Sequence, residues 1–151
     1  MSAAATLILR EGRVGRIDMS GVLPETLAGK SVAEIAAMPL RLDGHAIALG
    51  ELFAVLPGTG DGLVIEAEGI QLDRLGKDMT GGLLRVEGSA GHYAGQGLRG
   101  GELLITGDAG DFAANGLTGG LLRIEGNAGD WLGAALIGER AGMAGGVVAV
   151  A

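Results

Sequence analysis

Two glycine-rich segments have the residue types of a nucleotide-binding site. Gly29-Lys30-Ser31 matches the end of a P-loop, but Pro24 stands where that motif needs a glycine, and no buried strand leads into it. Gly95, Gly97 and Gly100 have the spacing of the dinucleotide fingerprint, yet they lie inside a repeat, with no following helix or ribose-binding acid. We therefore predict no cofactor site in this chain and expect these glycines to form corners.

Histidines are the next groups that could do chemistry. His45 and His92 are the only two, and they fall in different parts of the chain, so we predict no metal site. Asp111 and Asp130 take the place of His92 one and two repeats later. This replacement favours a solvated corner position for His92.

A row of carboxylates, Glu68, Glu87 and Glu125, could be taken for catalytic acids. Each lies in a segment where apolar and polar residues alternate, which points the carboxylate outward, beside Arg85 or Arg123. A solvated row of partial ion pairs is therefore expected. We predict no catalytic residue in this chain.

All these residues belong to a pattern that returns every 19 residues between Gly62 and Gly146. The residues two and four places before each marker glycine are apolar, which predicts one strand per repeat with a buried face, and Val86 above Ala67 and below Ile105. An aromatic row follows at Tyr93, Phe112 and Trp131, and its direction stays open. The marker glycines are Gly69, Gly88, Gly107 and Gly126, and double glycines close the repeats at 81–82, 100–101 and 119–120.

A short fixed period indicates stacked repeats, since one unit cannot bury its apolar face alone. A leucine-rich repeat would need an asparagine ladder, and helical repeats need longer units with less glycine. The pattern therefore predicts an all-β protein, a single-stranded parallel β-helix with coils of about 19 residues over 62–151. Glycine would supply the positive φ of its tight corners.

Positions 1–61 follow the repeat poorly and are predicted to form an N-terminal cap. Strands are expected at 6–10 and 16–19. Ser31 and Glu34 form a capping box for a short helix that Pro39 ends. Such a cap would cover apolar interior and unpaired strand edges at the end of the stack.

Composition excludes several classes of function. The chain has 151 residues, a net charge of −7, no cysteine and 31 glycines, 23 of them between positions 62 and 146. The negative charge argues against nucleic acid or an anionic membrane as a partner. The lack of cysteine excludes disulfides and thiolate metal sites. Residues 1–16 show no signal peptide or membrane span, so a cytoplasmic location is expected.

One irregularity interrupts the repeat. The double glycine expected 19 residues after Gly119-Gly120 comes seven residues late, at 145–146, which leaves an insertion at 137–142. It is either a tolerated surface loop or a recognition element. For the second case we predict a partner interface made by Ile137, Glu139, Arg140 and Met143. The strand expected at 147–150 would have an open edge, which suggests end-to-end self-association as a further possibility.

The segments MTGGLLRVEGSAG (79–91), LTGGLLRIEGNAGDWLGAAL (117–136) and GERAGMAGG (138–146) resemble the C subunit of formylmethanofuran dehydrogenase and of the bacterial formyltransferase/hydrolase complex. LPETLAGKSVAEIAAMPL (23–40) and ALGELFAV (48–55) resemble the same subunit. The glycine-rich coil is also similar to the C-terminal domain of glutamate synthase. The family's chain continues through further coils after the segment matching 147–151.

The resemblance implies a right-handed parallel β-helix that serves as a scaffold in one-carbon metabolism, where the complex acts on methanofuran or methylofuran. Catalysis would belong to partners: an amidohydrolase-like A subunit that holds the metals, a molybdopterin-type B subunit in the dehydrogenase, and a formyltransferase or D subunit. The choice between the redox dehydrogenase and the non-redox transferase/hydrolase stays open. So does a different function, a stand-alone protein that binds a carbohydrate or another partner on its surface.

Overall fold

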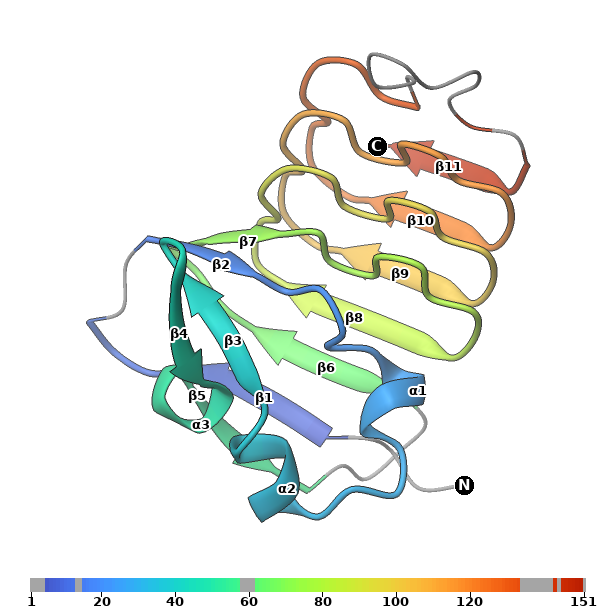
Figure 1. The fold of residues 1–151 in the computed structure, drawn as a ribbon. Helices are drawn as coiled ribbons and strands as arrows, with labels where there is room; N and C mark the ends of the chain where they lie inside the picture. The colour runs from blue at the N-terminus through green and yellow to red at the C-terminus, as the bar shows by residue number, and fades with distance from the viewer. Residues whose placement is uncertain (1–4, 13–14, 58–61, 134–142, 144, 151) are drawn as a thin grey trace.

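The computed structural model describes residues 5–12, 15–57, 62–133, 143 and 145–150 (Figure 1). The larger sheet has the strand order β11-β10-β9-β8-β6-β1-β5 and the smaller one β4-β3-β2-β7. The larger sheet consists of β11 (Val147–Val150), β10 (Leu121–Ile124), β9 (Glu102–Ile105), β8 (Leu83–Glu87), β6 (Leu63–Glu66), β1 (Ala5–Leu9) and β5 (Phe53–Leu56). The smaller consists of β4 (His45–Ala48), β3 (Pro39–Leu42), β2 (Arg16–Asp18) and β7 (Gln71–Asp73). Three short helices complete the described part: α1 (Pro24–Leu27), α2 (Val32–Ala36) and α3 (Leu49–Leu52).

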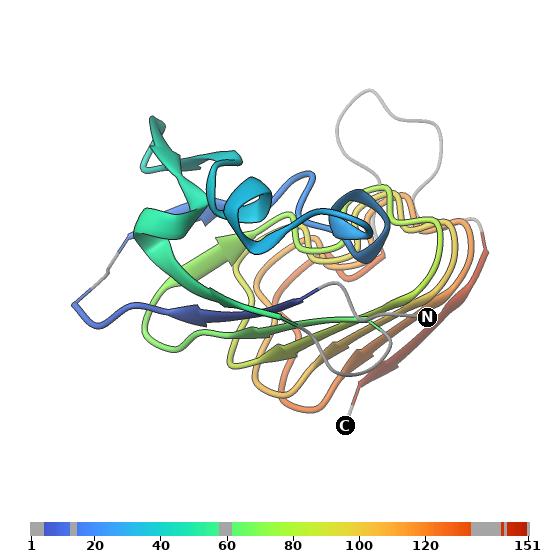
Figure 2. The same ribbon diagram turned by 90° about the horizontal axis from the view of Figure 1, so that it is seen from below.

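The repeats stack in register through their strands. Leu83 of β8 lies opposite Glu102 of β9, and Glu102 lies opposite Leu121 of β10, so each step from strand to strand advances the chain by one repeat. Figure 2 shows the turns of successive repeats lying over one another. The predicted alternation is confirmed, because the same inward positions are fully buried in every strand. These residues are Leu63, Ile65, Leu84, Val86, Leu103, Ile105, Leu122 and Ile124.

The period changes at both ends of the stack. Leu63 of β6 pairs with Leu84, where the repeat length predicts a pairing with Gly82, and Leu121 pairs with Val147 in place of position 140. Val86 therefore stacks on Ile65, and its predicted place above Ala67 is wrong. Two additional residues lie between β6 and Asp73, which is why the glycine marker at 69 is out of register with the later ones.

The predicted all-β single-stranded parallel β-helix is wrong. Both sheets are mixed: β1 pairs antiparallel with β5, and β3 pairs antiparallel with β2 and β4. Three helices are present among the described residues. The repeats of β8, β9 and β10 contribute one strand each to the described structure, because left-handed backbone conformations recur through the remainder of the repeat, for example at Tyr93, Gly95 and Gly97.

The two positions of the double glycines require glycine for different physical reasons. The second glycine, as at Gly101 and Gly120, has a φ of +79° or +73°, which an L side chain rarely adopts. The first glycine of the later pairs, as at Gly100 and Gly119, lies against the repeat before it. A Cβ on Gly119 would stand 2.1 Å from the carbonyl oxygen of Arg99, and one on Gly100 would stand 2.4 Å from that of Thr80.

The N-terminal residues fold through local signals. Ser31 Oγ accepts the Glu34 N–H at 3.1 Å and the Glu34 carboxylate accepts the Ser31 N–H at 2.9 Å, so the predicted capping box of α2 is confirmed. The β3–β4 hairpin turns through Asp43 and Gly44, both with positive φ. Each of the two sheets contains strands from before and from after the predicted boundary at 61/62. The division into a cap and repeats stays a prediction. Within the described ranges, no helix has the length and apolar character needed to cross a membrane.

Candidate functional site

Two residues of each repeat lie in register across the stack, at the end of β7 and in the turns after β8, β9 and β10. The first residue of each pair forms the polar row: Asp73, His92, Asp111 and Asp130. The second forms the stacked row: Arg74, Tyr93, Phe112 and Trp131. Every member of the stacked row has a φ between +57° and +63°. Such a conformation is uncommon for bulky residues. In the stacked row Arg74, Tyr93 and Phe112 are half-buried and Trp131 is exposed.

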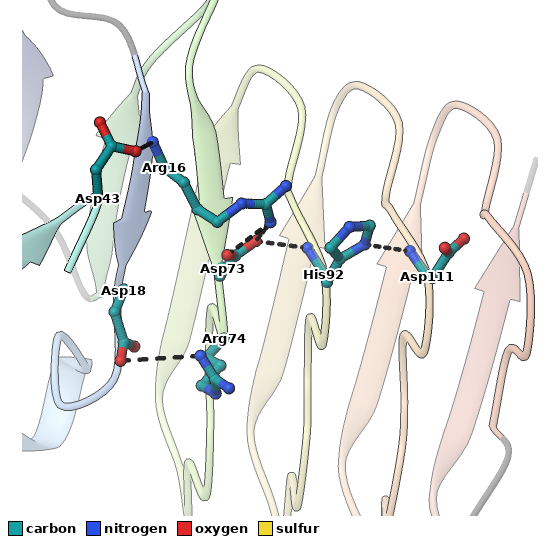
Figure 3. A network of polar contacts seen from close by, with 7 residues as sticks. All are labelled: Arg16, Asp18, Asp43, Asp73, Arg74, His92 and Asp111. Carbon is teal, nitrogen blue, oxygen red and sulfur yellow. Dashed lines mark hydrogen bonds and ion pairs between the residues drawn. The ribbon is translucent and has the colours of Figure 1, made fainter. Parts of the chain in front are cut away.

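The polar row links the repeats through side chain to backbone hydrogen bonds (Figure 3). The His92 N–H donates to Asp73 Oδ1 at 2.8 Å, and the Asp111 N–H donates to His92 Nδ1 at 2.9 Å. The Asp130 N–H then donates to Asp111 Oδ1 at 2.8 Å. Each side chain therefore satisfies a backbone donor of the next repeat, as a backbone N–H at a turn requires.

Arg16 of β2 begins this row. Its Nη1 lies 2.7 Å from both carboxylate oxygens of Asp73, whose side chain is only 8% exposed. A carboxylate buried to this extent needs a charge or hydrogen-bond partner. Asp73 has both in Arg16 and in the N–H of His92, so it connects the N-terminal residues to the repeats.

His92 has a structural role that sequence reasoning missed. The sequence predicts a solvated corner residue, but His92 is half-buried and its Nδ1 accepts a hydrogen bond from the Asp111 N–H. The sequence contains a signal for this role. The residues at this position of the repeats are aspartate or histidine, and both side chains can accept a hydrogen bond. His45 is exposed on β4. Within the described ranges, no three His, Cys, Asp or Glu side chains come together as a metal site would require.

The stacked row forms a continuous column of planar groups. The Tyr93 and Phe112 ring centroids are 5.5 Å apart at an interplanar angle of 15°, and those of Phe112 and Trp131 are 6.2 Å apart at 14°. The Arg74 guanidinium covers the other face of Tyr93, 5.2 Å from its centroid. Stacking of this kind stabilises each aromatic pair by about 0.5–1.5 kcal/mol, which helps to offset the left-handed backbone.

The column differs at its two ends. At the first end Arg74 also faces Asp18, with 3.9 Å between Nη1 and Oδ2. Burial raises the pKa of Asp18, but hydrogen bonds from the hydroxyl and N–H of Ser20, and the charges of Arg74 and Lys77, outweigh it, so that this pKa lies below its usual value. At the last end Trp131 is 65% exposed.

Glu68 and Glu87 of the predicted acidic row lie beside an open hollow of about 490 Å³ at the carboxyl ends of β6 and β8, whereas Glu125 does not line it. Glu87 pairs with Arg85 at 3.1 Å, both side chains being 43% exposed, so for this pair the predicted outward ion pairing is confirmed. Arg10 donates to the carbonyl of Gly50 at 2.9 Å. The residues around the hollow are Leu9, Arg10, Glu11, Gly12, Glu66, Ala67, Glu68, Glu87, Gly88 and Thr106. Such a hollow of carboxylates with a single guanidinium resembles a solvated surface more than a reaction site.

The two nucleotide-like segments have structural roles. Gly29 has a φ of +79° in the turn between α1 and α2, and Ser31 caps α2. Gly95 and Gly97 have positive φ at a corner of the repeat, as predicted.

The predicted partner interface falls mostly outside the described residues, which include Met143 but not Ile137, Glu139 or Arg140. Met143 is 37% exposed, and its N–H donates to the Gly133 carbonyl at 2.9 Å. The same turn exposes Leu132, at 43%, together with Trp131. The predicted interface does not include Trp131 or Leu132, although large exposed apolar residues are a usable signal of a contact surface.

Two comparisons with known proteins find similar chains, while no protein-family model matches this sequence. The C subunit of the formyltransferase/hydrolase complex (Fhc) of Methylorubrum extorquens is 37% identical over 87 residues, which cover 58% of this chain and 33% of that protein. The crystal structure of the formyltransferase/hydrolase complex of the same organism, bound to methylofuran, contains a chain that matches with a TM-score of 0.88. That match is 36% identical and covers 96% of this chain and 55% of the other.

The chain thus spans about a third of the curated relative and about half of the structural neighbour. Both matches concern the formyltransferase/hydrolase complex, and neither supports the oxidoreductase alternative. The resemblance to the C subunit of this complex, predicted from the glycine-rich repeats, is therefore confirmed at moderate identity.

Proposed function

We propose that this chain acts as the scaffolding C subunit in a formyltransferase/hydrolase complex of one-carbon metabolism, and that the complex acts on methylofuran or a related methanofuran-type carrier. The observation that carries the proposal is the structural match, with a TM-score of 0.88 across 96% of this chain at 36% identity. Likeness at this level extends well beyond a shared fold class, because the N-terminal residues are matched together with the repeats.

The scaffold role is supported by how the chain uses its polar groups. Asp73, His92 and Asp111 each accept a hydrogen bond from the backbone of the next repeat, so the groups suited to acid–base chemistry already hold the stack together. In this proposal the chemistry and its metals belong to an amidohydrolase-like A subunit and to a formyltransferase, the D subunit. The B subunit completes the complex. The chain itself binds no cofactor.

Co-expression with the three other subunits from the same source tests the proposal. A tag on this chain should recover those subunits in fixed stoichiometry, and formyl transfer or hydrolysis should be measured for the whole complex and absent from this chain alone. Failure of the wild-type chain to recover any of the three, under conditions where each is folded, would contradict the scaffold function. Turnover by the isolated chain, free of the others, would contradict the absence of catalysis.

A carbohydrate-binding function receives less support from the stacked row. Sugars bind aromatic residues by packing on a ring face, but the faces of Tyr93 and Phe112 are covered by their neighbours in the column. Trp131 alone of these three has the exposure of an open ring. An array of exposed rings along the corner, which a long glycan would need, is therefore lacking among these residues.

A further inference from the structure

The outer edge of the smaller sheet is open. β4 is the last strand of this sheet and pairs with β3 on one side only. Figure 1 shows that β4 lies far from β11, so a further repeat stacked on β11 would not cover it. Its residues His45 and Ala46 are exposed. The free edge of a strand presents backbone N–H and C=O groups with which another strand can pair.

The register of the ladder decides which backbone groups face the open side. Ile47 is hydrogen-bonded to β3, because two residues later the Leu49 N–H donates to the Met38 carbonyl at 2.8 Å, and the bonded positions of an antiparallel ladder alternate. The N–H groups of Ala46 and Ala48 and the Ala46 carbonyl therefore point away from β3. Within the part of the chain that the structure describes, these three groups have no hydrogen-bond partner.

The open edge is bounded at both ends. At its carboxyl end the Ala48 carbonyl accepts the first hydrogen bond of α3, so this helix begins on the open side, where the edge ends. At its amino end the hairpin turns through Asp43 and Gly44. The N–H of His45 faces β3, so the Gly44 carbonyl of the same planar peptide faces the open side. Arg41 Nη1 donates to this carbonyl at 3.0 Å, which leaves its second lone pair available.

We propose that β4 pairs antiparallel with β4 of a second copy of this chain, with the two Ala46 residues opposite each other. Each Ala46 N–H then donates to the Ala46 carbonyl of the other copy, and each Ala48 N–H donates to its Gly44 carbonyl. The donors and acceptors of the open edge are thereby matched, and the two smaller sheets become one. This inference goes beyond the proposed function and does not depend on it.

A second copy fits this edge better than a long extended segment of another protein does. The added strand must end beside Ala48, because α3 lies beyond that residue on the open side. In the antiparallel register the hairpin of the second copy turns at Gly44, which is opposite Ala48, and glycine brings no side chain towards α3. A longer extended segment would meet the helix.

Disulfide trapping tests the register, since the chain contains no cysteine. Ala46→Cys should give a covalent dimer under mild oxidation, because the Cα atoms of a hydrogen-bonded antiparallel pair lie about 5.5 Å apart, within the range of a disulfide. His45→Cys is the matched control, since His45 is also exposed but lies opposite Ile47 of the second copy. Its two Cα atoms are then beyond the limit of about 7 Å, so Ala46→Cys should cross-link at least about 10-fold faster.

Sedimentation of the full chain measures the association without a cross-link. Few hydrogen bonds hold the pair, so the dimer should be weak and is followed up to about 1 mM protein. Ala48→Pro removes one donor of the edge, and the φ of −72° at this position suits proline. It should raise the dimer Kd at least about 10-fold. Ala48→Ser retains the N–H and should dimerise like the wild type, and thermal unfolding checks that both variants fold.

Three results would overturn the pairing of β4. They are equal cross-linking of Ala46→Cys and His45→Cys, a wild-type chain that stays monomeric up to about 1 mM, and a dimer that Ala48→Pro leaves intact. The proposed function fails separately. A chain that dimerises through β4 but captures none of the other three subunits would support the pairing and contradict the scaffold function.

Discussion

Glycine has different functions in the N-terminal residues and in the repeats. Gly12, Gly21, Gly29 and Gly44 all have positive φ, and a Cβ on any of them would meet nothing within 4 Å. In the repeats, Gly100, Gly119 and Gly145 have no such φ, but a Cβ would lie 2.1–2.4 Å from a carbonyl oxygen of the repeat before. These four N-terminal glycines permit turns, whereas the three glycines of the repeats permit two backbones to approach each other.

The contrast extends to what holds each region together. The N-terminal residues use a capped helix, a hairpin and large buried side chains such as Phe53 and Met19. The repeats use buried aliphatic rows, backbone contacts and the polar row, all at one spacing. A side-chain change should therefore have a local effect in the first region, while in the repeats a small change of volume affects two neighbours at once.

The largest effect is expected from Ile105→Ala in the centre of the stack. Ile105 is fully buried between Val86 and Ile124, and the cavity adds to the lost burial, so the free energy of unfolding should fall by about 2–4 kcal/mol. Urea denaturation followed by circular dichroism measures it. Leu104→Ala, on the outward side of the same strand, should cost clearly less. Equal losses for both variants would contradict the assigned faces.

Close approach of the backbones is tested by a matched pair of glycines. Gly119→Ala should destabilise the chain by about 1–3 kcal/mol, because the new methyl group would push against the Arg99 carbonyl. Gly81 has the same place in the first double glycine, but a Cβ there meets nothing within 4 Å. Gly81→Ala should thus be near neutral in the same denaturation experiment, and a comparable loss would show that conformation, not contact, requires glycine at this position.

The N-terminal region should respond more weakly to loss of a local signal. Ser31→Ala removes the hydroxyl that accepts the Glu34 N–H at the start of α2 and should lower the free energy of unfolding by about 1 kcal/mol. Ser31→Asp, which restores an acceptor, should recover most of the loss. If alanine and aspartate behave alike in thermal unfolding, the cap does not contribute.

The smallest effect concerns the contact between α1 and the repeats. Glu25 accepts hydrogen bonds from the N–H and hydroxyl of Thr80, both at 2.7 Å. Burial raises the pKa of Glu25, but these bonds outweigh it and the pKa is lowered. The ionised carboxylate therefore stabilises the fold above its unfolded-state pKa, and this contribution is lost as the pH falls from about 5 to about 3. Wild-type stability should decline more steeply over this range than that of Glu25→Gln, and parallel curves would exclude the contribution.

The sequence predicts best what depends on spacing alone. The alternation identifies the buried face of β8, β9 and β10, and the capping box locates α2, since both are local patterns with one physical meaning. The longer spacing between β6 and β8 could not be read from Gly69. This glycine lies 19 residues before Gly88, while the strand residues Leu63 and Leu84 that pair are 21 residues apart.

The predicted fold class is wrong because periodicity reveals that units stack and does not reveal how much of each unit is extended. Left-handed conformations at Tyr93, Phe112 and Ala114 leave short strands, and nothing in those residue types predicts positive φ. The Asp43-Gly44 pair is a readable hairpin signal that the sequence analysis does not use. The sequence shows that Tyr93, Phe112 and Trp131 recur at the repeat spacing. The direction of their side chains depends on the backbone conformation, which the residue types do not reveal.

The regular offset of Gly82, Gly101 and Gly120 makes the stack modular. Because a Cβ on Gly101 would meet the backbone of Gly82, and one on Gly120 would meet the backbone of Gly101, a gene segment between two of these glycines begins and ends at equivalent positions. Duplication or loss of such a segment would change the length of the protein by a whole unit while joining surfaces that already fit. Homologues of different length can therefore arise by unequal recombination within the repeats, with no new core to evolve.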